Sequence, residues 1–64
     1  MTKRLIVGIS GASGAPIAVE LLRALRDTDV ESHLIISRGG EYTIPQETSL
    51  SVPQVRALAD KTYS

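Results

Sequence analysis

The chain has 64 residues, seven acidic and seven basic side chains that cancel, one His and no Cys. This composition excludes disulfides and a thiolate metal site, and a single His does not hold a metal without carboxylates, so we expect none. The zero net charge argues against a nucleic-acid partner, and the apolar run "LIVGI" is too short for a signal peptide or a membrane span, so we expect a cytoplasmic globular chain.

The first predicted element is a strand over Arg4–Ser10, because its apolar residues are continuous rather than alternating. Such a run is typical of a parallel strand covered on both faces. From Pro16 the apolar residues follow helical spacing, and proline fits the first turn of a helix. We expect this helix to end near Asp27–Asp29, with an apolar side formed by Ile17, Ala18, Leu21, Leu22, Ala24 and Leu25.

A second strand is predicted over Val30–Ser37, which is apolar at its centre. In the next segment, "RGGEYTIPQETSL", glycines and Pro45 disfavour a long helix, so we expect a short helix before Pro45 and then a turn. Ser51 and Gln54 have the spacing of a capping box, which predicts a last helix. Its apolar stripe consists of Val52, Val55, Leu58 and Ala59.

Strand, helix and strand in this order form a βαβ unit with a right-handed crossover and parallel strands. Two such strands and a few helices cannot cover a parallel sheet on both faces, and purely parallel sheets occur almost only in larger α/β proteins. We therefore predict a Rossmann-like α/β fold in which residues 1–64 are the N-terminal portion of a single, incomplete domain.

The loop between the first strand and the first helix, "VGISGASGAP", has Gly8, Gly11 and Gly14 at every third position, with Ser10 and Ser13 between them. Nucleotide phosphates bind at this place in open α/β sheets, because glycines allow close approach and the helix N-terminus offers free N–H groups. The loop lacks the Lys of a Walker motif, and its spacing is not Gly-x-Gly-x-x-Gly. A tight turn with glycines for packing alone remains the alternative.

The end of the second strand discriminates between cofactors. A site that prefers NAD places an acidic residue there to hold the ribose hydroxyls. The chain has Ser37 and Arg38 instead, and no acid before Glu41. NAD is therefore disfavoured, whereas NADP stays open because Arg38 could meet a 2′-phosphate, and Ser37 could equally bind a flavin. Arg38 as a solvated surface residue is the other reading.

Four stretches, "KRLIVGISGASGAP", "HLIIS", "QET" and "SVPQVRALAD", follow one another at separations that resemble the flavin prenyltransferase family (UbiX type). Within that family the chain is most similar to the small B subunit of hydroxyarylic acid decarboxylase systems, which act on 4-hydroxybenzoate, vanillate or phenolic acids. The resemblance covers essentially the whole chain and corresponds to the N-terminal part of much longer proteins.

The resemblance implies a flavodoxin-like flavoprotein domain that transfers a dimethylallyl group from dimethylallyl phosphate to N5 and C6 of FMN. The prenylated FMN would serve a UbiD-type decarboxylase, and the enzyme would be a homo-oligomer, usually a dodecamer. By the same resemblance, Gly11, Ala12 and Ser13 contact FMN, and Ser37 contacts it from the second strand. Glu47 matches the catalytic glutamate near the prenyl donor, and Ser13 is a second catalytic candidate, in proton relay.

Other features limit these expectations. The groups that hold the prenyl phosphate in the family would lie beyond Ser64, so the chain alone should be inactive. "RGGEYTIP" departs from the helix formers that the family has there. We expect His33 to be a strand residue without chemistry, and Tyr42 to cover the core. An NADP-dependent oxidoreductase and a non-catalytic flavin-binding subunit of the decarboxylase complex remain the alternative functions.

Overall fold

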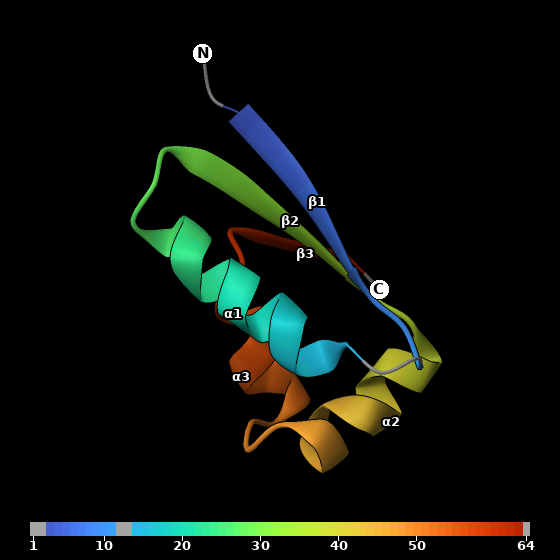
Figure 1. Ribbon diagram of the computed structural model, residues 1–64. Coiled ribbons are helices and arrows are strands. Elements are labelled where there is room, and N and C mark those ends of the chain that lie inside the picture. The colour runs from blue at the N-terminus through green and yellow to red at the C-terminus, as the bar shows by residue number, and fades with distance from the viewer. Residues whose placement is uncertain (1–2, 12–13, 64) are drawn as a thin grey trace.

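A parallel sheet with helices between its strands forms the fold. The computed structural model describes residues 3–11 and 14–63. Its elements, in chain order, are β1 (Lys3–Ile9), α1 (Ala15–Arg26), β2 (Val30–Ile36), α2 (Arg38–Glu47), α3 (Val52–Arg56) and β3 (Lys61–Tyr63). The strands lie in the order β1-β2-β3 and all pair in parallel, and the helices lie on one side of them (Figure 1). The predicted βαβ unit and the α/β class are confirmed.

The register of the sheet brings the carboxyl ends of the first two strands together. Lys3 is opposite Val30 at one end of the pair, and Ile9 is opposite Ile36 at the other. β3 joins the far side of β2 over only three residues, with His33 opposite Lys61. The loops that follow β1 and β2 therefore start side by side.

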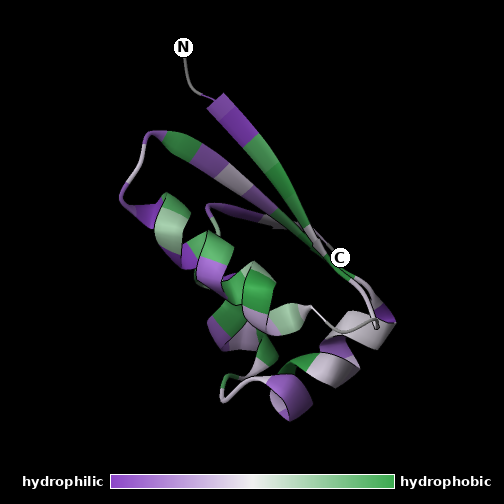
Figure 2. Ribbon diagram, viewed as in Figure 1, coloured by the Kyte–Doolittle hydropathy of each residue, from purple (hydrophilic) through white to green (hydrophobic). Residues whose placement is uncertain are grey.

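One hydrophobic core lies between the sheet and the helices. Figure 2 shows hydrophobic stretches on β1, β2 and the helices beside them. Fully burying an aliphatic side chain contributes about 1.5–3 kcal/mol, so this cluster is the main favourable contribution to stability. Its members are Val7, Ile9, Ala15, Val19, Leu22, Leu34, Ile36, Ile44 and Val55.

The opposite face of the sheet is open in the described part of the chain. Successive strand residues point to opposite faces, so Val7 and Leu34 face the helices while Ile6 and Ile35 do not. Ile6 is 69% exposed and Ile35 is 46% exposed. The expected cover is thus present on one face only among the described residues.

The expected apolar side of α1 is only partly buried. Leu22 packs into the core as expected, whereas Ile17 is 76% exposed and Leu21 is 39% exposed. Ala15 and Val19, which were not among the expected residues, are buried. The apolar residues of α1 span more of the helix surface than the sheet covers, so periodicity alone could not select the buried ones. None of the described helices is long and apolar enough to cross a membrane.

The expectation of a short helix ending before Pro45 is wrong. α2 runs through both glycines and through Pro45 to Glu47. Gly40 and Ile44 are buried, and their packing against the sheet stabilises the helix. Thr48 is the C-cap and donates its backbone N–H to the carbonyl oxygen of Ile44 over 2.9 Å. Packing therefore outweighs the single helical hydrogen bond that proline removes. Tyr42 does not cover the core, because it is 70% exposed on this helix.

The C-terminal segment is partly as predicted. The capping box is present: Ser51 Oγ accepts from the N–H of Gln54 over 3.3 Å, and Gln54 Oε1 accepts from the N–H of Ser51 over 2.8 Å. The helix ends earlier than its apolar stripe, at Arg56, and Leu58 and Ala59 pack against the core from the turn that follows. The short strand β3 was not predicted from the sequence.

Candidate functional site

The candidate site lies where β1 and β2 end. The backbone N–H of Ser37 donates to the carbonyl oxygen of Ile9 over 3.0 Å, which joins the two strand ends directly. The glycine loop leaves β1 at this point and α2 leaves β2. In open parallel sheets, ligands bind at the carboxyl ends of the strands, so this edge is the expected place for a phosphate-bearing ligand.

The glycine loop runs from this edge to α1. Gly11 is exposed, whereas Ala12 and Ser13 lie outside the described residues, so the structure does not describe these two predicted site residues. Gly14 is the N-cap of α1 with φ 156° and ψ −4°, a conformation that favours glycine. Glycine has no side chain to cap the helix, and the first-turn N–H groups of a helix are natural partners for an anion.

Ser37 is the N-cap of α2. Its Oγ accepts from the backbone N–H of Gly40 over 3.1 Å, and its backbone is extended, as the N-cap position requires. A hydroxyl is one donor and a twofold acceptor, so Ser37 keeps its own proton to donate to a ligand. The residue is exposed at the same edge as Gly11.

Glu47 comes to the glycine loop from the far end of α2. It is exposed, and it lines a hollow of about 280 Å³ together with Gly14, Pro16 and Ile17. The walls of this hollow other than Glu47 are apolar or glycine. A carboxylate beside an apolar surface can exchange a proton with a group held there. The structure thus brings Glu47 close to the start of α1.

A larger hollow, of about 330 Å³, lies at the other end of the sheet. It is formed where β2 and β3 begin, and ligand sites of parallel α/β sheets are found at the opposite ends of the strands. We therefore do not assign the ligand to it. Its lining residues are Thr28, Asp29, Val30, Glu31, Asp60 and Lys61.

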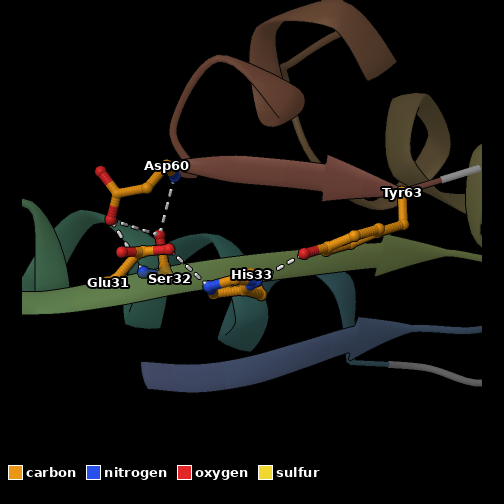
Figure 3. A network of polar contacts seen from close by, with 5 residues as sticks. All are labelled: Glu31, Ser32, His33, Asp60 and Tyr63. Carbon is orange, nitrogen blue, oxygen red and sulfur yellow. Dashed lines mark hydrogen bonds and ion pairs between the residues drawn. The ribbon is translucent and has the colours of Figure 1, made fainter. Parts of the chain in front are cut away.

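Sequence reasoning missed a polar network on β2 and β3, shown in Figure 3. His33 Nε2 lies 2.7 Å from Glu31 Oε1, and His33 Nδ1 lies 2.8 Å from the hydroxyl of Tyr63. An ionised carboxylate only accepts, so Nε2 donates to Glu31 and, in the neutral ring, Nδ1 accepts from Tyr63. The two rings stack with centroids 5.8 Å apart. No sequence spacing indicates this pairing, because β3 itself was not predicted.

On the helix-facing side, the same pair of strands is joined by Ser32 and Asp60. Asp60 Oδ2 accepts from the backbone N–H of Ser32 over 2.8 Å, and Ser32 Oγ accepts from the N–H of Asp60 over 3.1 Å. Ser32 is 2% exposed, so these bonds satisfy a buried polar residue. Both networks fix β3 beside β2 and take no part in the candidate site.

Comparison with known proteins gives close relatives. The chain is 56% identical over 62 residues to the flavin prenyltransferase UbiX of Escherichia coli K12, covering 95% of this chain and 33% of that protein. It is 45% identical over 62 residues to the mitochondrial flavin prenyltransferase PAD1 of Saccharomyces cerevisiae, covering 97% of this chain and 26% of that protein. The chain thus spans about a third, or less, of the length of these curated relatives. No family model matches it.

Solved structures agree with the fold. The crystal structure of AnUbiX (PadA1) in complex with FMN and dimethylallyl pyrophosphate matches with a TM-score of 0.92 and 41% identity, over 98% of this chain and 34% of that one. A dodecameric FMN-dependent UbiX-like decarboxylase from Escherichia coli O157:H7 matches with a TM-score of 0.88 and 49% identity, over 94% of this chain and 33% of that one. The resemblance to UbiX-type flavin prenyltransferases is confirmed over nearly the whole chain.

Proposed function

We propose that this chain is the flavin-binding N-terminal portion, residues 1–64, of a UbiX-type flavin prenyltransferase. The whole protein would transfer a dimethylallyl group from dimethylallyl phosphate to FMN. The observation that carries this proposal is the match to a structure that holds FMN and a dimethylallyl donor, together with relatives named flavin prenyltransferases. The open face of the sheet supports the view that the domain is incomplete, since parallel sheets are normally covered on both faces.

The glycine loop and the start of α1 fit the phosphate-bearing part of FMN. Gly11 offers backbone without a side chain at the exposed edge, and Gly14 leaves the N-terminus of α1 without a side-chain cap. We assign Gly11, Ala12 and Ser13 to FMN contacts, as the resemblance implies. The role of these groups is to bind and orient: N–H and hydroxyl donors neutralise an anion, and glycine permits its close approach.

Ser37 is assigned to FMN from the end of β2. Its oxygen accepts a hydrogen bond from the N–H of Gly40, so α2 restrains the position of this oxygen. A donor held in this way loses little freedom on binding, which favours affinity and orientation. Ser37 would hold an oxygen or nitrogen acceptor of FMN at the edge where the glycine loop begins.

The hollow beside Glu47 is proposed to receive the dimethylallyl group. Five carbons suit the apolar surface of Pro16 and Ile17, and burial of each CH₂ contributes about 0.8 kcal/mol. In the transfer, the C–O bond to the phosphate breaks, a bond to the flavin forms, and phosphate leaves. FMN supplies the nucleophilic ring atoms when bound. In this proposal Glu47 would take a proton from the flavin or give one to the leaving phosphate, and Ser13 is the second candidate for proton relay.

The product points to partners beyond this chain. We infer that prenylated FMN is handed to a UbiD-type hydroxyarylic acid decarboxylase, and that the chain is part of a B subunit of such a system. A cytoplasmic homo-oligomer, a dodecamer by analogy with one structural match, is part of the same proposal. Because the phosphate-binding groups of the family would come from the rest of the protein, the 64 residues alone should not catalyse the transfer.

Two other functions have less support. Arg38 is exposed at the first position of α2, where a 2′-phosphate of NADP would reach it, but the relatives are flavin prenyltransferases. A flavin-binding subunit without catalysis would share every binding residue but would not need Glu47 at the hollow. We therefore rank prenyl transfer first.

The experiment is an incubation of the protein, expressed from its complete reading frame, with FMN, a reductant and dimethylallyl phosphate. Mass spectrometry of the released flavin is expected to find FMN with one dimethylallyl group added. Recovery of bound but unmodified FMN would favour the non-catalytic subunit. Failure to bind FMN, with binding of NADPH, would favour the oxidoreductase.

A further inference from the structure

One face of α2 follows the glycine loop along its length. Gly39, Thr43 and Glu47 are spaced by four residues and so lie on neighbouring turns of the same helix face. Gly39 packs against Gly11, and Thr43 Oγ1 lies 3.2 Å from the carbonyl oxygen of Gly40 in its own helix and 3.5 Å from that of Ser10. Glu47 lines the hollow at the start of α1. Each turn of α2 thus lies beside a different part of the segment that leads from β1 into α1.

The contact between Gly39 and Gly11 is backbone against backbone. A Cβ atom at Gly39 would lie 2.9 Å from Gly11 Cα and 3.0 Å from Gly11 N. Ordinary contacts of a Cβ are longer, so a side chain there would push the loop away by about 0.5 Å, the tolerance within which a binding site must be held. In this chain the absence of a side chain at position 39 lets the loop rest directly on the helix.

Gly40, the next residue, has a different neighbour. A Cβ there would collide with the carbonyl oxygen of Ile9 and would lie 3.1 Å from Ile36 Cγ2. Gly40 is buried with Ile44 on the core side of α2, whereas Gly39 is exposed. The two glycines therefore have different roles in the same turn of α2. Gly40 lets the helix pack on the sheet, and Gly39 lets the glycine loop pack on the helix.

We propose that Gly39, supported by Thr43, is a positioning residue that sets where the glycine loop holds its ligand. Glycine is a poor helix former, and an exposed glycine inside a helix has no reason in burial or propensity. The contact with Gly11 supplies the reason. The inference rests on the proposed function because the ligand is taken to be FMN. The contact between Gly39 and Gly11 does not depend on the proposed function.

The test is Gly39→Ala in the protein expressed from its complete reading frame. The clash with the Gly11 backbone should cost stability and the better helix propensity of alanine should offset part of it, so the melting temperature without FMN should fall less than in Gly40→Ala. Displacement of the loop should raise the Kd for FMN about tenfold, whereas the KM for dimethylallyl phosphate should not change. An unchanged Kd for FMN would overturn the proposal.

Two variants keep the result interpretable. Gly40→Ala should lower the melting temperature, because its strain enters the core, and should weaken FMN binding less than Gly39→Ala does. Thr43→Val removes the hydroxyl near Ser10 and should also raise the Kd for FMN, by a smaller factor than Gly39→Ala. If Gly39→Ala fails to fold, Thr43→Val tests the proposal in its place. A Kd that follows the melting temperature across all three variants would show a merely structural role and overturn the proposal.

Failure of the proposed function can be told apart from failure of this inference. If the wild-type protein does not bind FMN, the proposed function fails. The contact is then tested by the backbone amide NMR signals of Ser10 and Gly11. They should shift in Gly39→Ala more than in Thr43→Val, and unchanged signals in Gly39→Ala would contradict the inference.

Discussion

Ser37 donates its backbone N–H to the carbonyl oxygen of Ile9 over 3.0 Å, and this bond ties the carboxyl ends of β2 and β1 together. Ser37 also caps α2 through its hydroxyl. One residue therefore closes the sheet edge, starts the helix that supports the glycine loop, and presents a hydroxyl proton to that edge.

Replacement of Ser37 separates its capping role from its proposed role toward the ligand. Ser37→Ala removes an N-cap oxygen and should lower the free energy of unfolding by about 1 kcal/mol. It should also raise the Kd for FMN about fivefold, the value of one hydrogen bond. Urea denaturation and FMN titration measure the two effects.

The matched control is Ser51→Ala. Ser51 is the N-cap of α3 and is absent from the candidate site, so its loss should give a similar drop in stability with no change in the Kd for FMN. Equal weakening of FMN binding in both variants would remove Ser37 from the site.

Glu47 should act in the reaction rather than in flavin binding. Glu47→Gln keeps the shape of the side chain and removes its proton chemistry, so kcat for prenyl transfer should fall about a hundredfold or more. The Kd for FMN should stay close to that of the wild type. Glu41→Gln, at an exposed position in the first turn of the same helix, should leave kcat unchanged. A wild-type kcat for Glu47→Gln would exclude it as a catalytic residue.

The unexpected length of α2 depends on Ile44. This residue is fully buried, so Ile44→Ala should lower the free energy of unfolding by about 2–5 kcal/mol through lost burial and a cavity. Tyr42→Ala removes a larger side chain from the same helix, but one that is 70% exposed, and should lower it much less. Thermal denaturation of both variants checks the difference, and similar losses would contradict the dependence of α2 on Ile44.

The pairing of β2 with β3 depends on Asp60. Asp60→Ala leaves the buried N–H of Ser32 without its acceptor, which should cost about 1–3 kcal/mol of stability (Figure 3). Asp60→Asn retains an oxygen acceptor and should lose less. Urea denaturation compares the two variants. Identical losses of stability in Asp60→Ala and Asp60→Asn would mean that the negative charge of Asp60, rather than its hydrogen-bond acceptor, stabilises the pairing of β2 with β3.

The elements that depend on interactions between residues close in the sequence were predictable. The two long strands, α1 and the capping box of Ser51 and Gln54 follow from continuous apolarity, helical spacing and paired side-chain bonds between near neighbours. The meeting of the carboxyl ends of β1 and β2 at one edge of the sheet follows from the parallel strands of the βαβ unit. The positions of Ser37 and Gly11 at this edge were predictable for the same reason.

What the sequence did not predict depends on distant contacts. Gly39 and Gly40 weaken a helix taken alone, and only the approach of Gly11 and the Ile9 carbonyl explains them. Ile17 has the periodicity of a core residue, yet the sheet does not reach it. β3 is three residues long and is defined by its partners on β2, so no local pattern marks it.

The central claim is that the edge formed by Gly11, the start of α1 and Ser37 holds FMN. Its most direct test is a titration of FMN, followed by flavin fluorescence, into the protein expressed from its complete reading frame. We predict saturable binding that Ser37→Ala and Gly39→Ala both weaken, and that excess NADPH does not displace. Absence of saturable FMN binding, or displacement of FMN by NADPH at comparable concentration, would contradict the account.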